Sequence, residues 1–162
     1  MDKLIELAAL VGLRLKERGL ILTTAESCTG GGVAQAITEI AGSSAWFDCG
    51  FVTYSNASKM ALLQVPASLL EQHGAVSNET AGAMAAGALR NSNATIALST
   101  TGIAGPDGGV PGKPVGTVCF GWAIGDVVTV ERKHFDGDRH AVRVQTVDYA
   151  LRGVLALLDQ AA

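Results

Sequence analysis

Apolar residues are distributed along the chain in two patterns, one typical of helices and one typical of strands. In residues 2–18 the apolar side chains recur every three or four positions, and Gly19 follows as a residue that commonly ends helices. Short runs of β-branched and aromatic residues predict strands, and longer apolar or alanine-rich runs predict helices between them. The strands are expected at residues 20–24, 45–54 and 95–99, and the helices at residues 33–40, 58–63, 67–72 and 77–91.

The last third of the chain predicts a hairpin and a closing helix. Two apolar runs are separated by Gly125-Asp126, a dipeptide that favours a tight turn. The runs span residues 115–124 and 127–135, and the helix is expected at residues 139–158. We therefore predict one α/β domain over residues 1–162, in which the hairpin favours a mixed sheet over a fully parallel one.

The composition narrows the class of protein. Hydrophobic residues make up 48% of the 162 residues and charged residues 17%, which excludes an intrinsically disordered chain. The 12 Lys and Arg residues and 15 Asp and Glu residues give a net charge of −3, which does not favour binding to nucleic acid or to an anionic membrane. Aromatic residues are 5% of the chain and there are 20 glycines, so the core is expected to consist of small and aliphatic side chains.

The N-terminus and the cysteines exclude further classes. Residues 1–19 contain charged side chains throughout, so they predict neither a signal peptide nor a membrane span. The three cysteines, Cys28, Cys49 and Cys119, lack the paired spacing of a disulfide framework or a zinc site. We therefore expect a reduced, cytoplasmic protein, and the scattered histidines and carboxylates predict no metal.

Hydroxyl, carboxylate and thiol side chains gather in the segment TTAESCTGGG, residues 23–32, where a predicted strand is followed by a helix. In open α/β sheets, ligands bind beyond the carboxyl ends of the strands, where helix N-termini offer free N–H groups. Ser27 is therefore a candidate nucleophile, and the backbone N–H groups of Cys28 to Gly30 are candidates to hold the oxyanion. The alternative is that Ser27 and Thr29 only cap the helix. Cys28, as a thiolate, is a second candidate nucleophile.

A second polar segment, TYSNASK at residues 53–59, follows another predicted strand. A serine nucleophile needs a base, and a lysine serves when burial lowers its pKa. Lys59 lies just inside a predicted helix after the strand end, and Tyr54 offers a hydroxyl to relay a proton. The alternative for Lys59 is a solvated surface charge, and the sequence alone does not bring Lys59 next to Ser27.

A glycine-rich segment, residues 100–116, follows a third predicted strand. Glycines let backbone N–H groups approach a phosphate or a ribose closely, and a loop of this length is more often functional than a plain connection. The alternative is a flexible crossover between two strands. Arg139 and Arg143 share a face of the last helix and are candidates to clamp a phosphate, although such side chains are often only solvated. Glu26 and Asp107 are candidates to orient an amine or a ribose.

Six segments in order are similar to the CinA C-terminal domain family. They are TTAESCTGG (23–31), GFVTYSNASK (50–59), GAVS (74–77), TGIAGPDGG (101–109), KPVGTV (113–118) and DGDRHAVR (136–143). The resemblance covers about residues 4–158, and the number of motifs makes it specific. It implies a three-layer α/β/α sandwich with a mixed sheet. It also implies the stand-alone type of member, without the N-terminal domain of longer CinA proteins, which is related to molybdopterin-binding folds.

The activity that the resemblance implies is hydrolysis of nicotinamide mononucleotide to nicotinic acid mononucleotide and ammonia, in pyridine nucleotide salvage. It implies Ser27 as the nucleophile, Lys59 as its base, Tyr54 as an assisting group, no metal or organic cofactor, and a homodimer. The predicted substrate-binding residues are Glu26, Cys28, Thr29, Gly30, Thr101, Gly102, Ala104, Gly105 and Arg143. The expected partner is thus a small-molecule nucleotide. The alternative function is a module that binds or senses a pyridine nucleotide without cleaving it.

Overall fold

The computed structural model describes the backbone of residues 2–160 and contains one five-stranded sheet. The strand order is β2-β1-β3-β4-β5, with β1 (Leu22–Glu26), β2 (Phe47–Val52), β3 (Ile96–Gly102), β4 (Thr117–Ile124) and β5 (Val127–His134). Strand β1 runs parallel to β2 and β3, whereas β3 pairs antiparallel with β4, and β4 with β5. The mixed sheet that the terminal hairpin predicted is therefore confirmed.

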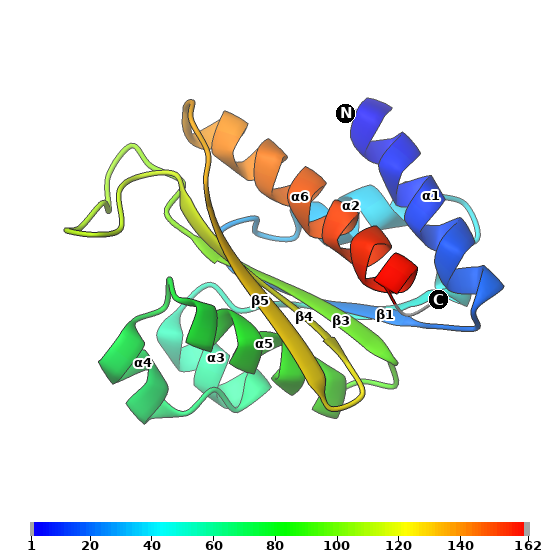
Figure 1. Ribbon diagram of the computed structural model, residues 1–162, viewed down its shortest axis with the longest axis horizontal. Coiled ribbons are helices and arrows are strands. Elements are labelled where there is room, and N and C mark those ends of the chain that lie inside the picture. The colour runs from blue at the N-terminus through cyan, green and yellow to red at the C-terminus, as the bar shows by residue number, and fades with distance from the viewer. Residues whose placement is uncertain (1, 161–162) are drawn as a thin grey trace.

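Helices cover both faces of the sheet, as Figure 1 shows. One face carries α1 (Asp2–Glu17), α2 (Gly32–Thr38) and α6 (Arg139–Gln160), and the other carries α3 (Asn56–Leu63), α4 (Ala67–His73) and α5 (Asn78–Arg90). A short 3-10 helix, η1 (Ser43–Ala45), precedes β2. The α/β/α sandwich is the architecture that the family resemblance implied.

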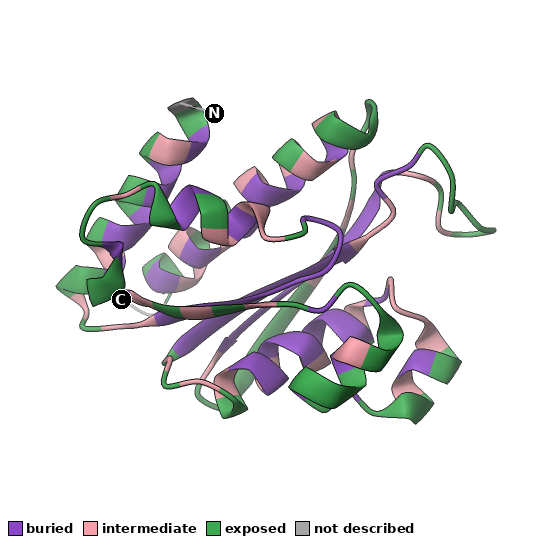
Figure 2. Cartoon of the chain, turned by 180° about the vertical axis from the view of Figure 1, so that it is seen from behind, coloured by how far each residue is buried: buried purple, intermediate pink, exposed green. Residues whose placement is uncertain are grey.

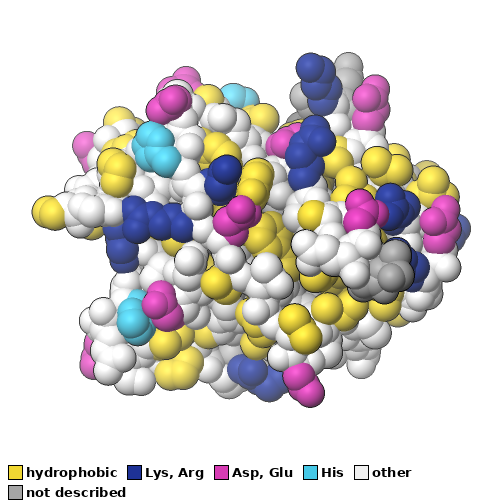
Figure 3. All heavy atoms as spheres, viewed as in Figure 1, with side chains coloured by type: hydrophobic (Ala, Val, Ile, Leu, Met, Phe, Trp, Pro, Cys, Tyr) yellow, Lys and Arg dark blue, Asp and Glu magenta, His cyan; other side chains and the backbone are white. Residues whose placement is uncertain are grey.

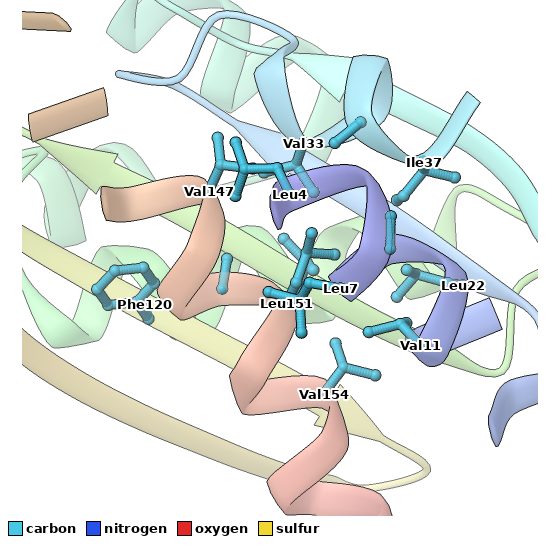
Figure 4. Packing of buried hydrophobic residues seen from close by; sticks show 14 of the residues in the cluster. Leu4, Leu7, Val11, Leu22, Val33, Ile37, Phe120, Val147, Leu151 and Val154 are labelled. Atoms are coloured by element: carbon cyan, nitrogen blue, oxygen red, sulfur yellow. The ribbon is translucent and has the colours of Figure 1, made fainter. Parts of the chain in front are cut away.

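The two faces of the sheet are packed with different side chains. Long aliphatic residues fill the space beneath α1, α2 and α6, among them Leu7, Val11, Leu151 and Val154 (Figure 4). Each of these helices therefore presents its apolar side to the sheet, as the spacing of apolar residues in the first helix predicted.

Small side chains dominate the opposite face, where α5 packs closely. Ala81, Ala85 and Ala88 of this helix are buried, and Figure 2 shows the buried residues on the inner sides of the helices. A Cβ atom added to Gly87 would lie 2.1 Å from the carbonyl oxygen of Leu63, so only glycine permits this approach of α5 to α3. This close packing fixes α3, which carries Lys59.

Several element boundaries differ from the sequence-based predictions. The first strand is Leu22–Glu26 rather than residues 20–24, because its pairing with β3 begins at Leu22. Strand β3 continues to Gly102 instead of ending at residue 99, because its last residues pair with β4. Thr101 and Gly102 thus belong to the end of β3, and the prediction that the glycine-rich segment begins directly after residue 99 was wrong. The segment after the strand, residues 103–116, is called the glycine loop below.

The carboxyl ends of the three parallel strands meet at one edge of the sheet. The chain continues from these ends at Ser27 after β1, at Thr53 after β2 and at Ile103 after β3. The loop between β3 and β4 projects from the same end of the molecule in Figure 1. The three polar segments singled out in the sequence are therefore neighbours in space.

Charged side chains of both signs are scattered among hydrophobic ones on the face drawn in Figure 3. Within residues 2–160, no helix combines the length and the apolar character needed to cross a membrane. The same part of the chain contains no group of three or more His, Cys, Asp or Glu side chains arranged to hold a metal ion.

Candidate active site

A cleft of about 310 Å³ opens at the carboxyl ends of β1, β2 and β3. Its walls come from the turn after β1, the start of α3, the segment before α5, the glycine loop and the start of α6. Eight of the predicted site residues line it: Ser27, Cys28, Tyr54, Lys59, Thr101, Gly102, Ala104 and Gly105. Four others, Glu26, Thr29, Gly30 and Arg143, do not line this cleft.

Ser27 and Lys59 meet inside the cleft. The Nζ atom of Lys59 lies 3.0 Å from the Oγ atom of Ser27, across 32 positions of sequence. Ser27 is 7% exposed and Lys59 1%, so both are removed from bulk water. The Ser27 N–H donates to the Thr100 carbonyl at 2.9 Å, and the capping box of Ser55 and Ser58 starts the helix that carries Lys59. The contact that the sequence left open is therefore present in the fold.

Carbonyl oxygens surround the Lys59 amino group. Its Nζ lies 2.9 Å from the Thr53 carbonyl oxygen and 3.4 Å from that of Tyr54, and within the described chain no carboxylate forms an ion pair with it. Burial lowers the pKa of Lys59 below its ordinary value of 10.5, because the charged form loses its hydration. The neutral amine, which is the form that accepts a proton, therefore forms more readily here than in an exposed lysine.

Cys28 also lines the cleft, but its thiol is held in the neutral form. Burial is the main cause that raises the pKa of this thiol from 9.0 to about 12, and the nearby Glu26 carboxylate adds to the shift. Because the thiolate is the reactive form of cysteine, this environment disfavours Cys28 as the nucleophile.

The carboxylate of Glu26 caps helix α2 instead of facing the cleft. Its Oε1 atom accepts hydrogen bonds from the Val33 N–H at 2.8 Å and from the Thr29 hydroxyl at 2.5 Å, and its Oε2 accepts from the Ala34 N–H at 3.1 Å. Glu26 thus accepts hydrogen bonds from N–H groups of the first helical turn. The sequence allowed this capping role for Ser27 and Thr29 instead. The Ser27 hydroxyl is left to interact with Lys59.

Arg143 approaches the turn after β1 from α6. Its Nε donates to the Cys28 carbonyl at 3.1 Å, and its Nη2 to the Thr29 carbonyl at 3.1 Å. Gly30 has a φ angle of +59°, and a Cβ atom there would lie 3.3 Å from Nη2 of Arg143. Arg143 lines an adjoining hollow of about 510 Å³ instead of the Ser27 cleft. Arg143, Thr29 and Gly30 therefore contribute to the shape of the turn.

Arg139, one helical turn earlier, is the arginine that lines the Ser27 cleft. Its Nη1 donates to the Gly105 carbonyl at 2.8 Å, and its Nη2 donates to the Tyr54 hydroxyl at 3.1 Å. Tyr54 is 61% exposed, so this contact lies at the open end of the cleft. Only two of the five guanidinium N–H groups of Arg139 have partners among residues 2–160, so the others are free to bind an anion.

The segment before α5 forms a wall that the sequence did not predict. Ala75 and Val76 line the cleft, and the Thr101 hydroxyl donates to the Ala75 carbonyl at 2.8 Å. These small apolar residues belong to the GAVS motif of the family resemblance, but they have no reactive side chain that would indicate a role. Only the fold brings them to the site.

The chain is similar to known proteins over nearly all of its length. The family model for the CinA C-terminal domain matches residues 4–158. The chain is 55% identical over 157 residues to a protein of Pseudomonas putida named nicotinamide-nucleotide amidohydrolase PncC, covering 97% of this chain and 98% of the relative. It is also 55% identical over 153 residues to the protein of that name from Escherichia coli K12, covering 93% and 92% of the two chains.

Solved structures show the same fold. A CinA superfamily protein from Klebsiella pneumoniae superposes with a TM-score of 0.94 at 41% identity, covering 97% of this chain and 98% of that chain. A competence/damage inducible protein from Agrobacterium tumefaciens superposes with a TM-score of 0.92 at 46% identity, covering 95% and 94%.

Proposed function

The chain belongs to the CinA C-terminal domain family, and on this premise we propose that it is an amidase that hydrolyses nicotinamide mononucleotide. The products are nicotinic acid mononucleotide and ammonia. The observation that carries the proposal is the 3.0 Å contact between Ser27 Oγ and Lys59 Nζ in a cleft, because it pairs a nucleophile with a base. The names of the relatives from Pseudomonas putida and Escherichia coli support the substrate.

The first step is attack of Ser27 on the carboxamide. Neutral Lys59 accepts the Ser27 hydroxyl proton while the serine oxygen bonds to the carboxamide carbon, and the carbonyl electrons move to oxygen. The oxyanion electrons then re-form the carbonyl and the C–N bond breaks. The Lys59 ammonium gives its proton to the departing nitrogen, which leaves as ammonia, and an ester of Ser27 remains. Water, activated by the same lysine, hydrolyses that ester.

The hydrogen bonds of Lys59 suit this role. The carbonyl oxygens of Thr53 and Tyr54 accept two of its N–H groups, so in the neutral amine the lone pair is directed to Ser27. The protonated form uses its third N–H toward Ser27. One arrangement of heavy atoms therefore serves both protonation states, and little reorganisation is needed when the proton moves.

The rest of the cleft binds the nucleotide in this proposal. Backbone groups of Thr101, Gly102, Ala104 and Gly105 approach the ribose and the phosphate, and the free N–H groups of Arg139 bind the phosphate. Tyr54, held by Arg139, assists at the open end of the cleft. Cys28 contacts the substrate with its backbone.

Three of the other predicted substrate-binding residues, Glu26, Thr29 and Gly30, act on the turn that carries Ser27. The reaction as proposed uses no cofactor. A cytoplasmic location remains a prediction from the cysteines of the sequence, and a place in pyridine nucleotide salvage and a homodimer remain predictions of the family resemblance.

The experiment is incubation of the purified protein with nicotinamide mononucleotide, with and without a chelator, followed by chromatography. We expect multiple turnovers to nicotinic acid mononucleotide in both samples. Ser27→Ala should abolish product formation, and Ser44→Ala, at an exposed position of η1, should not change it. Binding of the nucleotide without product would favour the sensing module. Activity of the Ser27→Ala variant equal to wild type would exclude the serine mechanism.

A further inference from the structure

The backbone of the turn that carries Ser27 is held by a side chain of another layer, Arg143 of α6. Arg143 contacts two consecutive carbonyl oxygens of this turn, those of Cys28 and Thr29, each at 3.1 Å. Its position is fixed by the core, because Val147, one helical turn further along α6, is buried beside Leu4 and Val33 (Figure 4). A Cβ atom on Gly32 would lie 3.2 Å from Val147, so α6 also lies close to the start of α2.

The two hydrogen bonds determine where the N–H groups of the turn point. In a trans peptide, the C=O and the N–H of one unit point in opposite directions. Arg143 binds the Cys28 carbonyl, so the Thr29 N–H is directed away from the guanidinium. It binds the Thr29 carbonyl, so the Gly30 N–H is turned away too, and this group donates to the Ser27 carbonyl at 3.0 Å. That bond in turn fixes the peptide whose N–H belongs to Cys28.

These constraints leave two N–H groups next to the nucleophile without a carbonyl partner in the described part of the chain. Neither the Cys28 N–H nor the Thr29 N–H donates to a backbone carbonyl within residues 2–160, whereas the Ser27 and Gly30 N–H groups both do. From the sequence, the N–H groups of Cys28 to Gly30 are all candidate oxyanion donors, and the structure removes Gly30 from that set. Cys28 and Thr29 are the two donors that are available.

We propose that Arg143 is a positioning residue, which orients the Cys28 and Thr29 N–H groups to hold the oxyanion formed when Ser27 attacks. This inference rests on the proposed function, because it takes Ser27 as the nucleophile. Arg143 also polarises the peptide unit whose carbonyl it binds, which strengthens the N–H on the opposite side as a donor. Arg143 therefore acts on the transition state through the backbone and does not bind the substrate.

The test separates kcat from KM in variants of Arg143, assayed with nicotinamide mononucleotide. We expect Arg143→Met to lower kcat about 10- to 100-fold, because the loss of one oxyanion donor lowers the rate by about 100- to 1,000-fold and here the donors are only misaligned. KM should stay within about threefold of the wild-type value. Arg143→Lys keeps the charge and one donor group, so we expect partial recovery of kcat. Arg152→Gln, at an exposed position of the same helix, is the matched control.

A second measurement distinguishes positioning from loss of folding. The aldehyde analogue of the substrate adds reversibly to Ser27: the serine oxygen bonds to the aldehyde carbon, the carbonyl electrons move to oxygen, and the proton passes to Lys59. We expect Arg143→Met to weaken inhibition by this analogue about 10- to 100-fold. Binding of nicotinamide mononucleotide should be equal in Ser27→Ala proteins with and without Arg143→Met.

The measurements distinguish a positioning role of Arg143 from substrate binding, from a purely structural role and from misfolding of the variant. A rise in KM with unchanged kcat would overturn the proposal and make Arg143 a substrate-binding residue. Unchanged kcat per folded molecule, or equal inhibition by the aldehyde in both proteins, would leave Arg143 with a structural role only. If Arg143→Met does not fold, Arg143→Lys decides by the same two ratios. Failure of the proposed function itself is seen separately, because wild-type protein would then form no product.

Discussion

The two walls of the cleft each carry a basic side chain, and the two side chains are in opposite surroundings. Lys59, on the α3 wall, is 1% exposed, and the hydrogen-bond partners of its amino group within residues 2–160 are a hydroxyl and two carbonyl oxygens. Arg139, on the α6 wall, is exposed and keeps most of its donors free. Neither forms an ion pair with a carboxylate within residues 2–160.

The difference shows how one site contains a proton acceptor and a fixed charge at once. Burial lowers the pKa of Lys59, so its ammonium group loses a proton more readily than that of an exposed lysine. A guanidinium stays charged at any physiological pH, and its exposure avoids the desolvation that burial would impose. In the proposed reaction the buried amine accepts and returns a proton, and the exposed guanidinium binds the phosphate.

The largest effect on activity is expected when Lys59 is replaced by a residue that cannot lose its proton. Lys59→Arg keeps a cation but removes the base, because arginine does not lose its proton. We expect kcat with nicotinamide mononucleotide to fall at least about 1,000-fold, and Lys59→Met to fall by a similar factor. Lys16→Met, at an exposed position of α1, is the control. An active Lys59→Arg enzyme would show that Lys59 acts only through its charge, and the contrast between the walls would disappear.

The fold could be predicted from the sequence because its signals are local. The hairpin at Gly125-Asp126 and the apolar spacing of the first helix each depend on neighbouring residues, and both were confirmed. The end of β3 was not predictable, because it is set by pairing with a distant strand and not by propensity. Boundaries that depend on partners elsewhere in the chain are where local patterns failed.

The site was predictable in its residue types but not in its contacts. Ser27 and Lys59 were recognised as a possible pair, yet their distance depends on the close packing of α3. Glu26 gave no sign that it would cap α2 seven residues later. The two arginines share one face of α6, and only the folded chain shows that Arg139 lines the cleft while Arg143 holds the turn.

The second effect concerns the exposed wall. Arg139→Met removes the cation that we assign to the phosphate, and hydrogen bonds to charged groups are worth about 1.5–3 kcal/mol. We therefore expect KM to rise about 10- to 100-fold, with a smaller change in kcat, in steady-state assays. Added salt should raise KM of the wild type more than that of the variant, because salt screens exposed charges. An unchanged KM would remove Arg139 from phosphate binding.

The third effect is on stability and follows from the direction of the Lys59 shift. The native pKa lies below 10.5, the ordinary value that applies in the unfolded chain. Between these two values the unfolded state binds more protons than the native state, so the free energy of unfolding contributed by Lys59 rises with pH, by at most about 1.4 kcal/mol per pH unit. Urea unfolding from pH 7 to pH 10 should show this slope in the wild type relative to Lys59→Met. A constant difference between the two proteins would mean that the Lys59 pKa is not lowered.

The smallest effect is expected from a substitution of Cys28, which lies beside Ser27. It tests whether Lys59 of α3 activates the serine hydroxyl or the cysteine thiol. Burial raises the pKa of this thiol to about 12, so at pH 8 only about one molecule in 10,000 carries the reactive thiolate. We expect Cys28→Ser to keep kcat within about threefold, and mass spectrometry after iodoacetamide treatment to find less labelling at Cys28 than at the partly exposed Cys49. If Cys28→Ser were inactive while Ser27→Ala retained activity, the nucleophile would be the thiol. The contact between Lys59 and the Ser27 hydroxyl would then not activate the nucleophile.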